Sequence, residues 1–264
     1  MSDPGAGLMP GVGLAVTGES PAPGAACSAP GATCLRPGGL ELTERIVGLA
    51  RLPRGARVLD VGCGRGATVA HLTDRLKLRP VGIDASPAQI ARARAARPDL
   101  DFAAGRAEDL PFAAGAFDAV LAECLLSTLP DARAALREMV RVLSDGGCVV
   151  VTDLYDRGDH HVQSRATLPS LGRREAVEAL LAGAGLEAET WEDHTAVLAR
   201  LFWDMATAAP GGAAGRAQAI TAPPPAGRAG RRLGYFACVA RAREGRAATS
   251  AATTRAKGAY GGRS

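Results

Sequence analysis

The segment VLDVGCGRG, residues 58–66, constrains the fold of this chain more than any other feature. Residues 57–61 form a short apolar run that meets an acidic residue and then closely spaced glycines, as a buried parallel strand does where it enters a βα loop. Glycines in such a turn let a ligand approach the backbone closely. The segment therefore predicts a strand, a glycine turn and a helix that form a ligand site. Gly62, Gly64 and Ala67 also match the spacing of a dinucleotide site, so the turn alone does not select the ligand.

Strand and helix signals alternate through the middle of the chain. Short apolar runs predict further strands at residues 81–83, 117–121 and 148–152, and later ones at 190–191 and 235–240. Alternating β and α units of this length predict an α/β fold with a doubly wound, mostly parallel seven-stranded sheet and helices on both faces. In such a sheet, ligands bind at the carboxyl ends of the strands.

Helices are predicted from capping residues and apolar spacing. Ser86 followed by Pro87 is typical of a helix start. A helix that places one face on the sheet and ends at Gly146-Gly147 is predicted by apolar residues at i, i+3, i+4 and i+7. These residues are Leu136, Met139, Val140 and Leu143. A further helix around residues 177–181 ends near Gly185.

The domain organisation follows from length and local composition. A chain of 264 residues is long enough for one sizeable α/β domain, which we expect to span residues 34–246. Residues 1–33 and 247–264 are predicted to be disordered tails, and residues 208–232 a low-complexity insertion rich in Gly, Ala and Pro.

Charge and cysteine distribution exclude several classes of protein. The net charge of +4 includes a late arginine cluster accompanied only by Tyr235 and Phe236, which argues against a nucleic-acid partner. That cluster consists of Arg228, Arg231, Arg232, Arg241, Arg243 and Arg246. The six cysteines form no CxxC pair, so we expect free thiols and no metal site. No apolar run reaches the ~20 residues of a membrane span, and no signal peptide is visible, which predicts a cytoplasmic protein with no membrane partner. The oligomeric state is left open.

Two acidic residues narrow the choice of ligand. Asp60 lies just before the first glycine, where its carboxylate would repel the pyrophosphate of NAD. It suits S-adenosyl-L-methionine, which has no phosphate and carries an ammonium and a sulfonium. The alternative is a carboxylate that only accepts backbone N–H bonds in the turn. Asp84 closes the second strand, where an acid can accept both hydroxyls of a ribose; the alternative is a cap for the helix at Pro87.

Several motifs occur in a characteristic order between about residues 42 and 155. They are Asp60-x-Gly62-x-Gly64-x-Gly66, Ile83-Asp84, residues 107–112 with Phe117-Asp118, and Val142-Leu143 with Gly146-Gly147. Together they resemble class I methyltransferases of the ubiquinone-biosynthesis and arsenite-methylating type. Residues 34–43 and 191–194 look most similar to an uncharacterised bacterial subgroup of these enzymes. The resemblance implies the seven strands, S-adenosyl-L-methionine as cofactor, and methyl transfer to a small-molecule acceptor.

The resemblance also implies a role for each matched position. The turn from Gly62 to Gly66 would hold the methionine moiety and Asp84 the ribose, while Ala107 and Glu108 would present backbone groups to the adenine. The predicted cofactor-binding residues are Asp60, Gly62, Cys63, Gly64, Gly66, Asp84, Ala85, Ala107, Glu108 and Glu123. Arg106 departs from the pattern, because many relatives have an acidic residue there that contacts the adenine amino group. An arginine cannot accept that bond.

The predicted catalytic residues are Glu123 and Cys124, which follow residues 117–121, and Asp153, which follows residues 148–152. Methyl transfer from a sulfonium is an in-line displacement, so a base is helpful rather than obligatory. Tyr155 and His194 are further polar groups, and His194 is equally typical of a helix cap.

Cys124 leaves an alternative function open, that of an arsenite or other metalloid methyltransferase. Trivalent arsenic favours soft thiolates, and Cys27 and Cys34 are further thiols. Against this alternative, buried cysteine is commonly a small apolar residue. A third possibility is a non-catalytic protein that binds S-adenosyl-L-methionine. An NAD(P)-dependent oxidoreductase is opposed by Asp60 and by the lack of a Tyr-x-x-x-Lys pair. Arg36, before the first helix, either binds an anionic group or stabilises its turn.

Overall fold

The computed structural model describes residues 36–158, 170–208 and 233–242, which contain a seven-stranded sheet of order β3-β2-β1-β4-β5-β7-β6. Its strands are β1 (Arg57–Val61), β2 (Arg79–Asp84), β3 (Asp101–Ala104), β4 (Phe117–Glu123), β5 (Leu143–Asp156), β6 (Leu186–Asp193) and β7 (Leu233–Ala242). The helices are α1 (Gly39–Leu49), α2 (Ala67–Asp74), α3 (Pro87–Ala96), α4 (Ala132–Val142), α5 (Arg174–Gly183) and α6 (Thr195–Ala208), with a short 3₁₀ helix η1 (Leu126–Thr128). Local sequence patterns do not predict β3 or α6.

The strands run in two directions. The pairs formed among β1, β2, β3, β4 and β5 are all parallel, whereas β7 pairs antiparallel with both β5 and β6. The sheet is therefore mixed rather than purely parallel. β7 follows β6 in the sequence but lies between β5 and β6 in the sheet.

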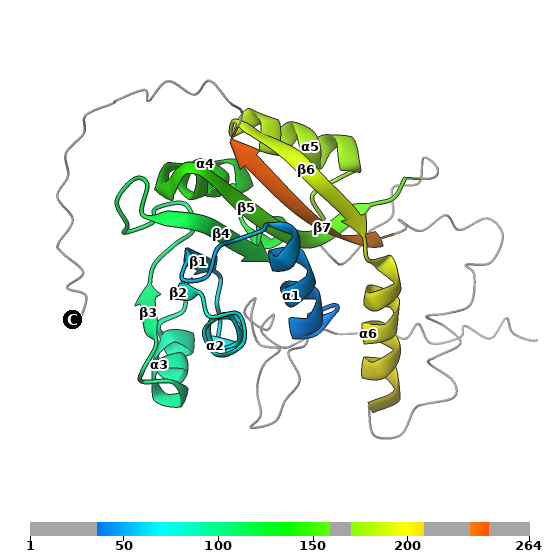
Figure 1. Cartoon of the computed structure of the whole chain (residues 1–264). Coiled ribbons are helices and arrows are strands. Elements are labelled where there is room, and N and C mark those ends of the chain that lie inside the picture. Colours follow the sequence, from blue (N-terminus) through cyan, green and yellow to red (C-terminus); the bar gives the residue numbers. More distant parts are fainter. Residues whose placement is uncertain (1–35, 159–169, 209–232, 243–264) are drawn as a thin grey trace, which may run out of the picture.

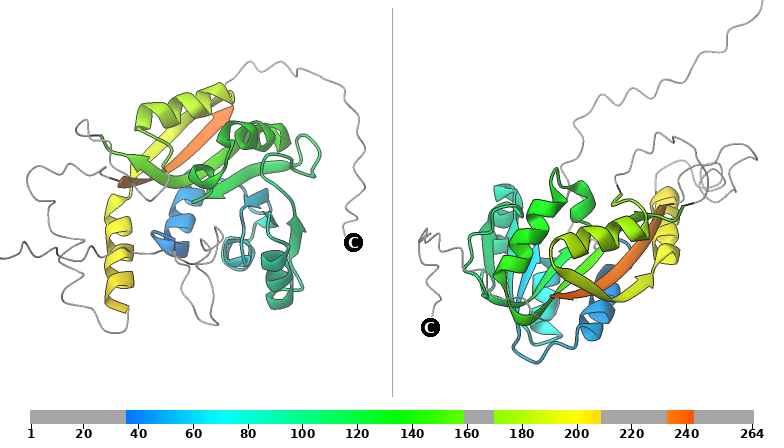
Figure 2. Two further views of the ribbon diagram at one scale, coloured as in Figure 1. Left: turned by 180° about the vertical axis from the view of Figure 1, so that it is seen from behind. Right: turned by 90° about the horizontal axis from the view of Figure 1, so that it is seen from above.

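Helices cover both faces of the sheet, as the doubly wound prediction requires. Figures 1 and 2 show α4 and α5 on one face and α1, α2, α3 and α6 on the other. On the first face, Met139 of α4 belongs to the same buried cluster as Val151 of β5. On the second face, Ile46 of α1 is buried with Val150 and Tyr235. Successive side chains of β5 thus enter opposite layers of the core.

The start of α3 is confirmed, and the end of α4 differs from the prediction. The Ser86 side chain accepts a hydrogen bond from the Gln89 N–H at 3.4 Å, and Pro87 is the first residue of α3. In α4 the helix ends at Val142, because Leu143 adopts an extended backbone (φ −72°, ψ 138°) and pairs with Phe117. Leu143 therefore continues the apolar spacing of the helix in sequence but belongs to β5 in the structure.

The order of the strands places the site. β1 and β4 are neighbours, and the connection after β1 leads to β2 on one side while the connection after β4 leads to β5 on the other. A crevice forms at the carboxyl ends of the strands where the order reverses in this way. Asp84 at the end of β2 and Glu123 at the end of β4 lie on the two sides of that crevice.

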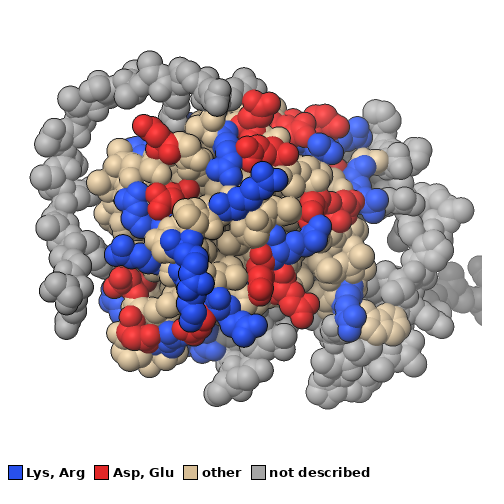
Figure 3. Space-filling view, viewed as in Figure 1, with Lys and Arg blue, Asp and Glu red and all other residues tan. Residues whose placement is uncertain are grey.

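The surface carries charges of both signs. Figure 3 shows basic and acidic side chains interspersed over the visible face. Arg97, for example, pairs with both Asp74 and Asp99. Of the late arginine cluster, only Arg241 is described, and it binds Glu189 as well as the carbonyls of Gly146 and Ala50.

Two expectations concern parts of the chain that are only partly described. In the described ranges, no helix is long and apolar enough to cross a bilayer. Residues 1–33 and 247–264 lie outside the described residues, as does the 208–232 insertion apart from Ala208, which ends α6.

Candidate functional site

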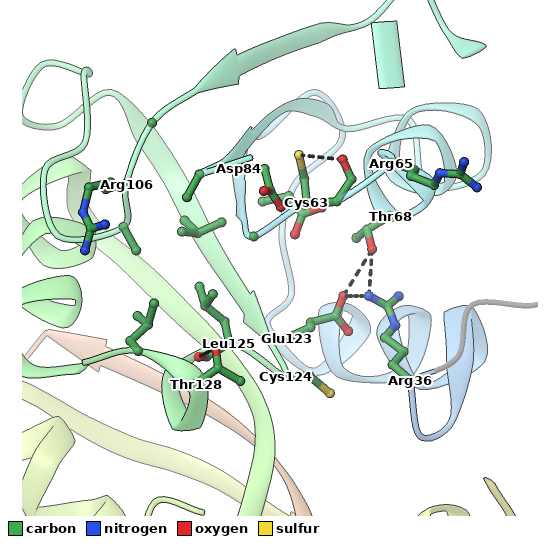
Figure 4. A pocket seen from close by; sticks show the side chains of 18 of the residues that line it. Arg36, Cys63, Arg65, Thr68, Asp84, Arg106, Glu123, Cys124, Leu125 and Thr128 are labelled. Carbon is green, nitrogen blue, oxygen red and sulfur yellow. Dashed lines mark hydrogen bonds and ion pairs between the residues drawn. The ribbon is translucent and has the colours of Figure 1, made fainter. Parts of the chain in front are cut away.

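A pocket of about 410 Å³ lies at the carboxyl ends of β1, β2 and β4 (Figure 4). Its walls come from the turn between β1 and α2, the residues after β2, β3 and β4, and the turn before α1. The predicted cofactor-binding residues all line this pocket except Gly66. Its volume lies within the range of small-molecule sites.

The three glycines of the turn after β1 have different neighbours. Gly62, Gly64 and Gly66 all have positive φ angles, of 78°, 55° and 79°, where side chains are strained. A Cβ on Gly66 would lie 2.5 Å from the ring of Phe102, so this glycine allows the turn to pack on β3. A Cβ on Gly64 would meet nothing within 4 Å. The space beside Gly64 is therefore open to a ligand.

Asp84 holds the turn and faces the pocket. Its Oδ2 accepts the Gly64 N–H at 2.9 Å, and its Oδ1 accepts the Ser86 N–H at 2.8 Å. A carboxylate oxygen has two lone pairs, so each oxygen keeps capacity for one more donor, such as a hydroxyl. The alternative role as a helix cap is taken by Ser86, whose side chain accepts from the first turn of α3.

Asp60 is a buried carboxylate whose charge is not balanced within the turn. It is 3% exposed, and within the described chain its Oδ2 has no hydrogen-bond partner. The pKa of Asp60 is raised to about 7, chiefly by burial and also by the nearby Glu123 and Asp84 carboxylates, while Arg36 acts to lower it. A buried anion of this kind favours a cationic ligand.

Glu123 and Arg36 form a direct ion pair at one edge of the pocket. Glu123, at the end of β4, also accepts hydrogen bonds from the hydroxyls of Thr43 on α1 (2.9 Å) and Thr68 on α2 (3.3 Å). The Arg36 guanidinium donates to both threonines as well. The Glu123 carboxylate thus joins β4 to α1, to α2 and to the segment that carries Arg36.

Cys124 lies in the pocket wall with a positive φ of 52°, an unusual angle for a residue with a side chain. Its Sγ is 3.0 Å from the Tyr235 hydroxyl, which donates its own hydrogen to Thr152. The thiol hydrogen therefore points to the tyrosine oxygen. Burial raises the pKa of Cys124 to about 12, so the group is a neutral thiol at physiological pH.

The raised pKa of Cys124 predicts low reactivity. Iodoacetamide at about pH 8 is expected to label Cys124 at least roughly a hundredfold more slowly in the native protein than in the unfolded chain, because only the thiolate attacks. Mass spectrometry of the labelled peptide after timed quenching measures this ratio. Comparable rates in the two states would show an accessible thiolate and would favour metalloid chemistry.

The structure places Asp153 outside the pocket wall, in contrast to the predicted catalytic position. It is 1% exposed and its Oδ atoms accept the backbone N–H groups of Ser127 (2.9 Å) and Leu154 (2.7 Å). Ser127 belongs to η1, whose neighbours Leu125 and Leu129 line the pocket. Asp153 thus positions η1 and has no access to a ligand, because both oxygens are directed at the backbone.

The adenine end of the predicted site contains Arg106, whose side chain is 65% exposed. It pairs with Glu108 at 3.2 Å, and both residues line the pocket beside Ala107. The Glu108 side chain is 15% exposed, so a partly buried carboxylate accompanies the arginine at this end.

The remaining polar candidates lie away from the pocket wall. Tyr155 donates to Asp193 at 2.9 Å and packs edge-on against Trp191. His194 lies 2.8 Å from Glu192, and its carbonyl accepts the Val197 N–H in the first turn of α6. Of the two roles considered for His194, the helix-start position is the one seen.

Sequence reasoning missed the network around Glu123. Thr43 and Thr68 carry no motif signal, and their role depends on α1 and α2 both facing the end of β4. Arg36 was expected either to bind an anionic group or to stabilise its turn, and its pairing with Glu123 was not predicted. Within the described residues, no cluster of three His, Cys, Asp or Glu side chains suited to a metal ion is found, and Cys27 and Cys34 lie outside them.

The part of the chain that forms most of this pocket is similar in sequence to known proteins. Residues 59–151 match the family described as Methyltransferase domain. Demethylmenaquinone methyltransferase from Beutenbergia cavernae is 43% identical over 99 residues, which cover 38% of this chain and 41% of that protein. 27-O-demethylrifamycin SV methyltransferase from Amycolatopsis mediterranei is 32% identical over 172 residues, covering 58% of this chain and 61% of that protein. The chain thus matches about two fifths of the length of the first relative and about three fifths of the second.

A solved structure extends the similarity over most of the fold. The (4+2)-cyclase SpnF has 27% identity and a TM-score of 0.61, and the alignment covers 76% of this chain and 80% of that one. The fold is therefore the α/β methyltransferase fold with its seven-stranded sheet. Residues 59–151 form a class I methyltransferase domain of the kind that uses S-adenosyl-L-methionine.

Proposed function

We propose that this protein transfers a methyl group from S-adenosyl-L-methionine to a small-molecule acceptor. The observation that carries the proposal is the unpartnered Oδ2 of Asp60, 3% exposed, beside the open space at Gly64. A neutral or anionic ligand would leave this carboxylate uncompensated, whereas a ligand with an ammonium and a sulfonium supplies the missing positive charge.

Different residues of the pocket suit different parts of the ligand. The open face of Gly64 and the carboxylates of Asp60 and Glu123 suit the amino-acid end. Asp84 has lone pairs left for the ribose hydroxyls after it has accepted two backbone N–H groups. Ala85, Ala107 and Glu108 line the end assigned to the adenine.

Methyl transfer requires little from the protein beyond the alignment of the acceptor with the methyl group. A lone pair of the acceptor attacks the methyl carbon as the carbon–sulfur bond breaks, and the bonding electrons stay on sulfur. The acceptor proton leaves before or after this step. Glu123 is held by Arg36 and Thr43, and Cys124 is a neutral thiol, so both are positioned to shape the site rather than to remove that proton.

The acceptor class is inferred from the pocket wall and from the relatives. Leu125, Leu129 and Pro130 give the wall beyond β4 an apolar surface. The relatives are named for a quinone and for a rifamycin, both of which are small molecules. We therefore infer an acceptor with an apolar body and one nucleophilic O, N, C or S atom.

The metalloid alternative has weaker support. It requires several thiolates around one arsenic atom, and Cys124 is a thiol engaged with Tyr235. A protein of similar fold is named as a cyclase rather than as a methyltransferase, so cofactor binding alone would not establish methyl transfer. Binding alone would also leave the non-catalytic alternative standing. Turnover, and not binding alone, must therefore be measured.

The first experiment measures binding and turnover together. Calorimetric titration is expected to show binding of S-adenosylmethionine and S-adenosylhomocysteine and no binding of NADH. In Asp84→Ala the affinity should fall roughly tenfold or more, because one or two hydrogen bonds to a charged group, each about 1.5–3 kcal/mol, are lost.

Turnover is then followed as S-adenosylhomocysteine released in the presence of a naphthoquinol, a macrocyclic phenol, a secondary amine or arsenite. Release with one of the first three supports the proposal, and release with arsenite alone favours the metalloid function. Tight binding with no release across the panel favours the non-catalytic protein, and preferred binding of NADH would contradict the cofactor assignment.

A further inference from the structure

Arg36 occupies an enclosed position at the edge of the pocket. Its side chain is 13% exposed, and in Figure 4 it points from the segment before α1 toward Glu123. Its guanidinium also donates to Thr68 at 2.8 Å and to Thr43. The turn that carries it is closed by the Gly39 N–H, which donates to the Arg36 carbonyl at 3.2 Å. The guanidinium is therefore fixed in place before any ligand arrives.

The start of α2 lies beside this guanidinium. Gly66 is the N-cap residue and provides no side-chain cap, so first-turn N–H groups of the eight-residue helix keep their capacity to donate. Ala67 and Thr68 of this turn line the pocket. A helix N-terminus and a neighbouring guanidinium together favour an anionic group.

The opposite charge is found next to it. Asp60 and Glu123 are buried carboxylates of the same pocket, and the Asp60 Oδ2 has no partner in the described part of the chain. A site in which two buried carboxylates lie close to a guanidinium matches a zwitterion, in which an ammonium and a carboxylate share one carbon.

We propose that Arg36 binds the carboxylate of the ligand's amino-acid moiety and makes the pocket select nucleoside ligands that carry an intact α-amino acid. The proposal rests on the proposed function. In this structure Glu123 pairs with Arg36. When the ligand binds, its ammonium pairs with Asp60 and Glu123 and its carboxylate pairs with Arg36, so one ion pair is exchanged for a network of alternating charges.

The test compares three probes that share the adenosine thioether. S-adenosylhomocysteine has both charges, its decarboxylated analogue keeps only the ammonium, and 5′-methylthioadenosine has neither. Calorimetry with the full chain is expected to rank them in that order for the wild type. In Arg36→Met, S-adenosylhomocysteine should lose roughly tenfold or more in affinity. The decarboxylated analogue should bind equally well or more tightly, because Glu123 is released from Arg36, and 5′-methylthioadenosine should be unchanged.

Controls separate charge recognition from a general loss of shape. Arg54→Met removes an exposed arginine outside the pocket and should alter none of the three affinities. Arg36→Lys keeps the charge without the planar fork and should lose only part of the affinity for S-adenosylhomocysteine. Arg36→Met leaves Glu123 buried and uncompensated, and this variant could fail to fold. In that case the affinities of Arg36→Lys and Arg36→Gln for S-adenosylhomocysteine are compared. A weaker affinity in Arg36→Gln, with 5′-methylthioadenosine bound equally by both variants, supports the proposal.

Two results would overturn the proposal in distinguishable ways. An equal loss of affinity for all three probes would show that Arg36 only shapes the pocket, and the proposed function would stand. Failure of the wild type to bind any adenosine thioether would overturn the proposed function and this inference together.

Discussion

Asp60→Asn is expected to weaken the binding of S-adenosylmethionine roughly 10- to 100-fold, as the loss of one buried charge-assisted interaction implies. The wild type itself should show a pH dependence. Since the pKa of Asp60 is about 7 in the protein alone, binding of a cation must release the Asp60 proton at acidic pH. The affinity should therefore rise by up to about tenfold per pH unit below 7 and level off above it.

The groups that face Asp60 determine how this titration is assigned. Glu123 on β4 and Asp84 on β2 raise its pKa, and Arg36 before α1 lowers it. Calorimetry about one pH unit below and above 7 measures the proton release directly when two buffers of different ionisation enthalpy are used. A flat pH profile in Asp60→Asn, with a sloping one in the wild type, assigns the proton to Asp60. A slope that persists in the variant would refute the assignment.

Asp60→Asn should also stabilise the protein when no ligand is added. The folded-state pKa of Asp60 is raised from 3.8 to about 7, so between these values the folded state binds more protons than the unfolded chain. Its contribution to the free energy of unfolding therefore falls as the pH rises from about 4 to 7, by the order of 2–4 kcal/mol, and stays low above 7. At about pH 8 the Tm of Asp60→Asn should exceed that of the wild type.

Asp118→Asn is the matched control of opposite sign. In the wild type, hydrogen bonds from Arg57 hold the pKa of Asp118 below the ordinary value. The stabilising contribution of Asp118 is therefore present at neutral pH and is lost in acid. This variant should lower the Tm at about pH 8. A fall in Tm for both variants would mean that Asp60 is compensated by a group that the pocket does not reveal.

A pair of glycine substitutions should separate folding from ligand binding. Gly66→Ala places a Cβ 2.5 Å from Phe102 at a φ of 79°, so the protein should lose roughly 2–5 kcal/mol of stability, through strain and crowding. Gly64→Ala meets no atom within 4 Å and should cost about 1–2 kcal/mol for its positive φ. Its methyl group would occupy the space assigned to the ligand, so cofactor affinity should fall sharply while the fold persists.

Thermal unfolding and calorimetry on both variants measure the two effects, with about 2–4 °C of Tm expected per kcal/mol. Combining Gly66→Ala with Phe102→Leu should restore part of the stability, because the smaller side chain relieves the contact. Equal stability of the two single variants would contradict the distinct neighbours of these glycines. Unchanged affinity in Gly64→Ala would move the ligand away from the turn.

The sequence predicted the parts of the fold whose signals are local. The run into Gly62, the cap at Ser86 and the apolar spacing of α4 each depend on a few neighbouring residues, and the structure confirms the strand, cap and helix. The predicted end of α4 at Gly146-Gly147 was wrong, because the helix ends at Val142. Leu143 is apolar in either conformation, and only its pairing with Phe117 assigns it to β5.

Contacts between distant segments explain what the sequence did not predict. Most of the motif residues lie at the pocket because they follow the ends of adjacent strands. The direction of Asp153 depends on where η1 lies, and Glu123 meets Arg36 across 87 positions of sequence. No local pattern contains that pairing, which becomes visible only when α1 and β4 have been placed together.

The place of β7 has a consequence for how the chain reaches its native state. Among the strands that the structure describes, β6 is hydrogen-bonded to β7 alone, and β7 is a ten-residue strand that comes last in the sequence. During synthesis, residues 186–193 therefore emerge with no neighbouring strand, and β5 keeps one edge exposed until residue 242 has left the ribosome. Closure of the sheet is a late, long-range event, and until then both edges offer templates for pairing with other chains.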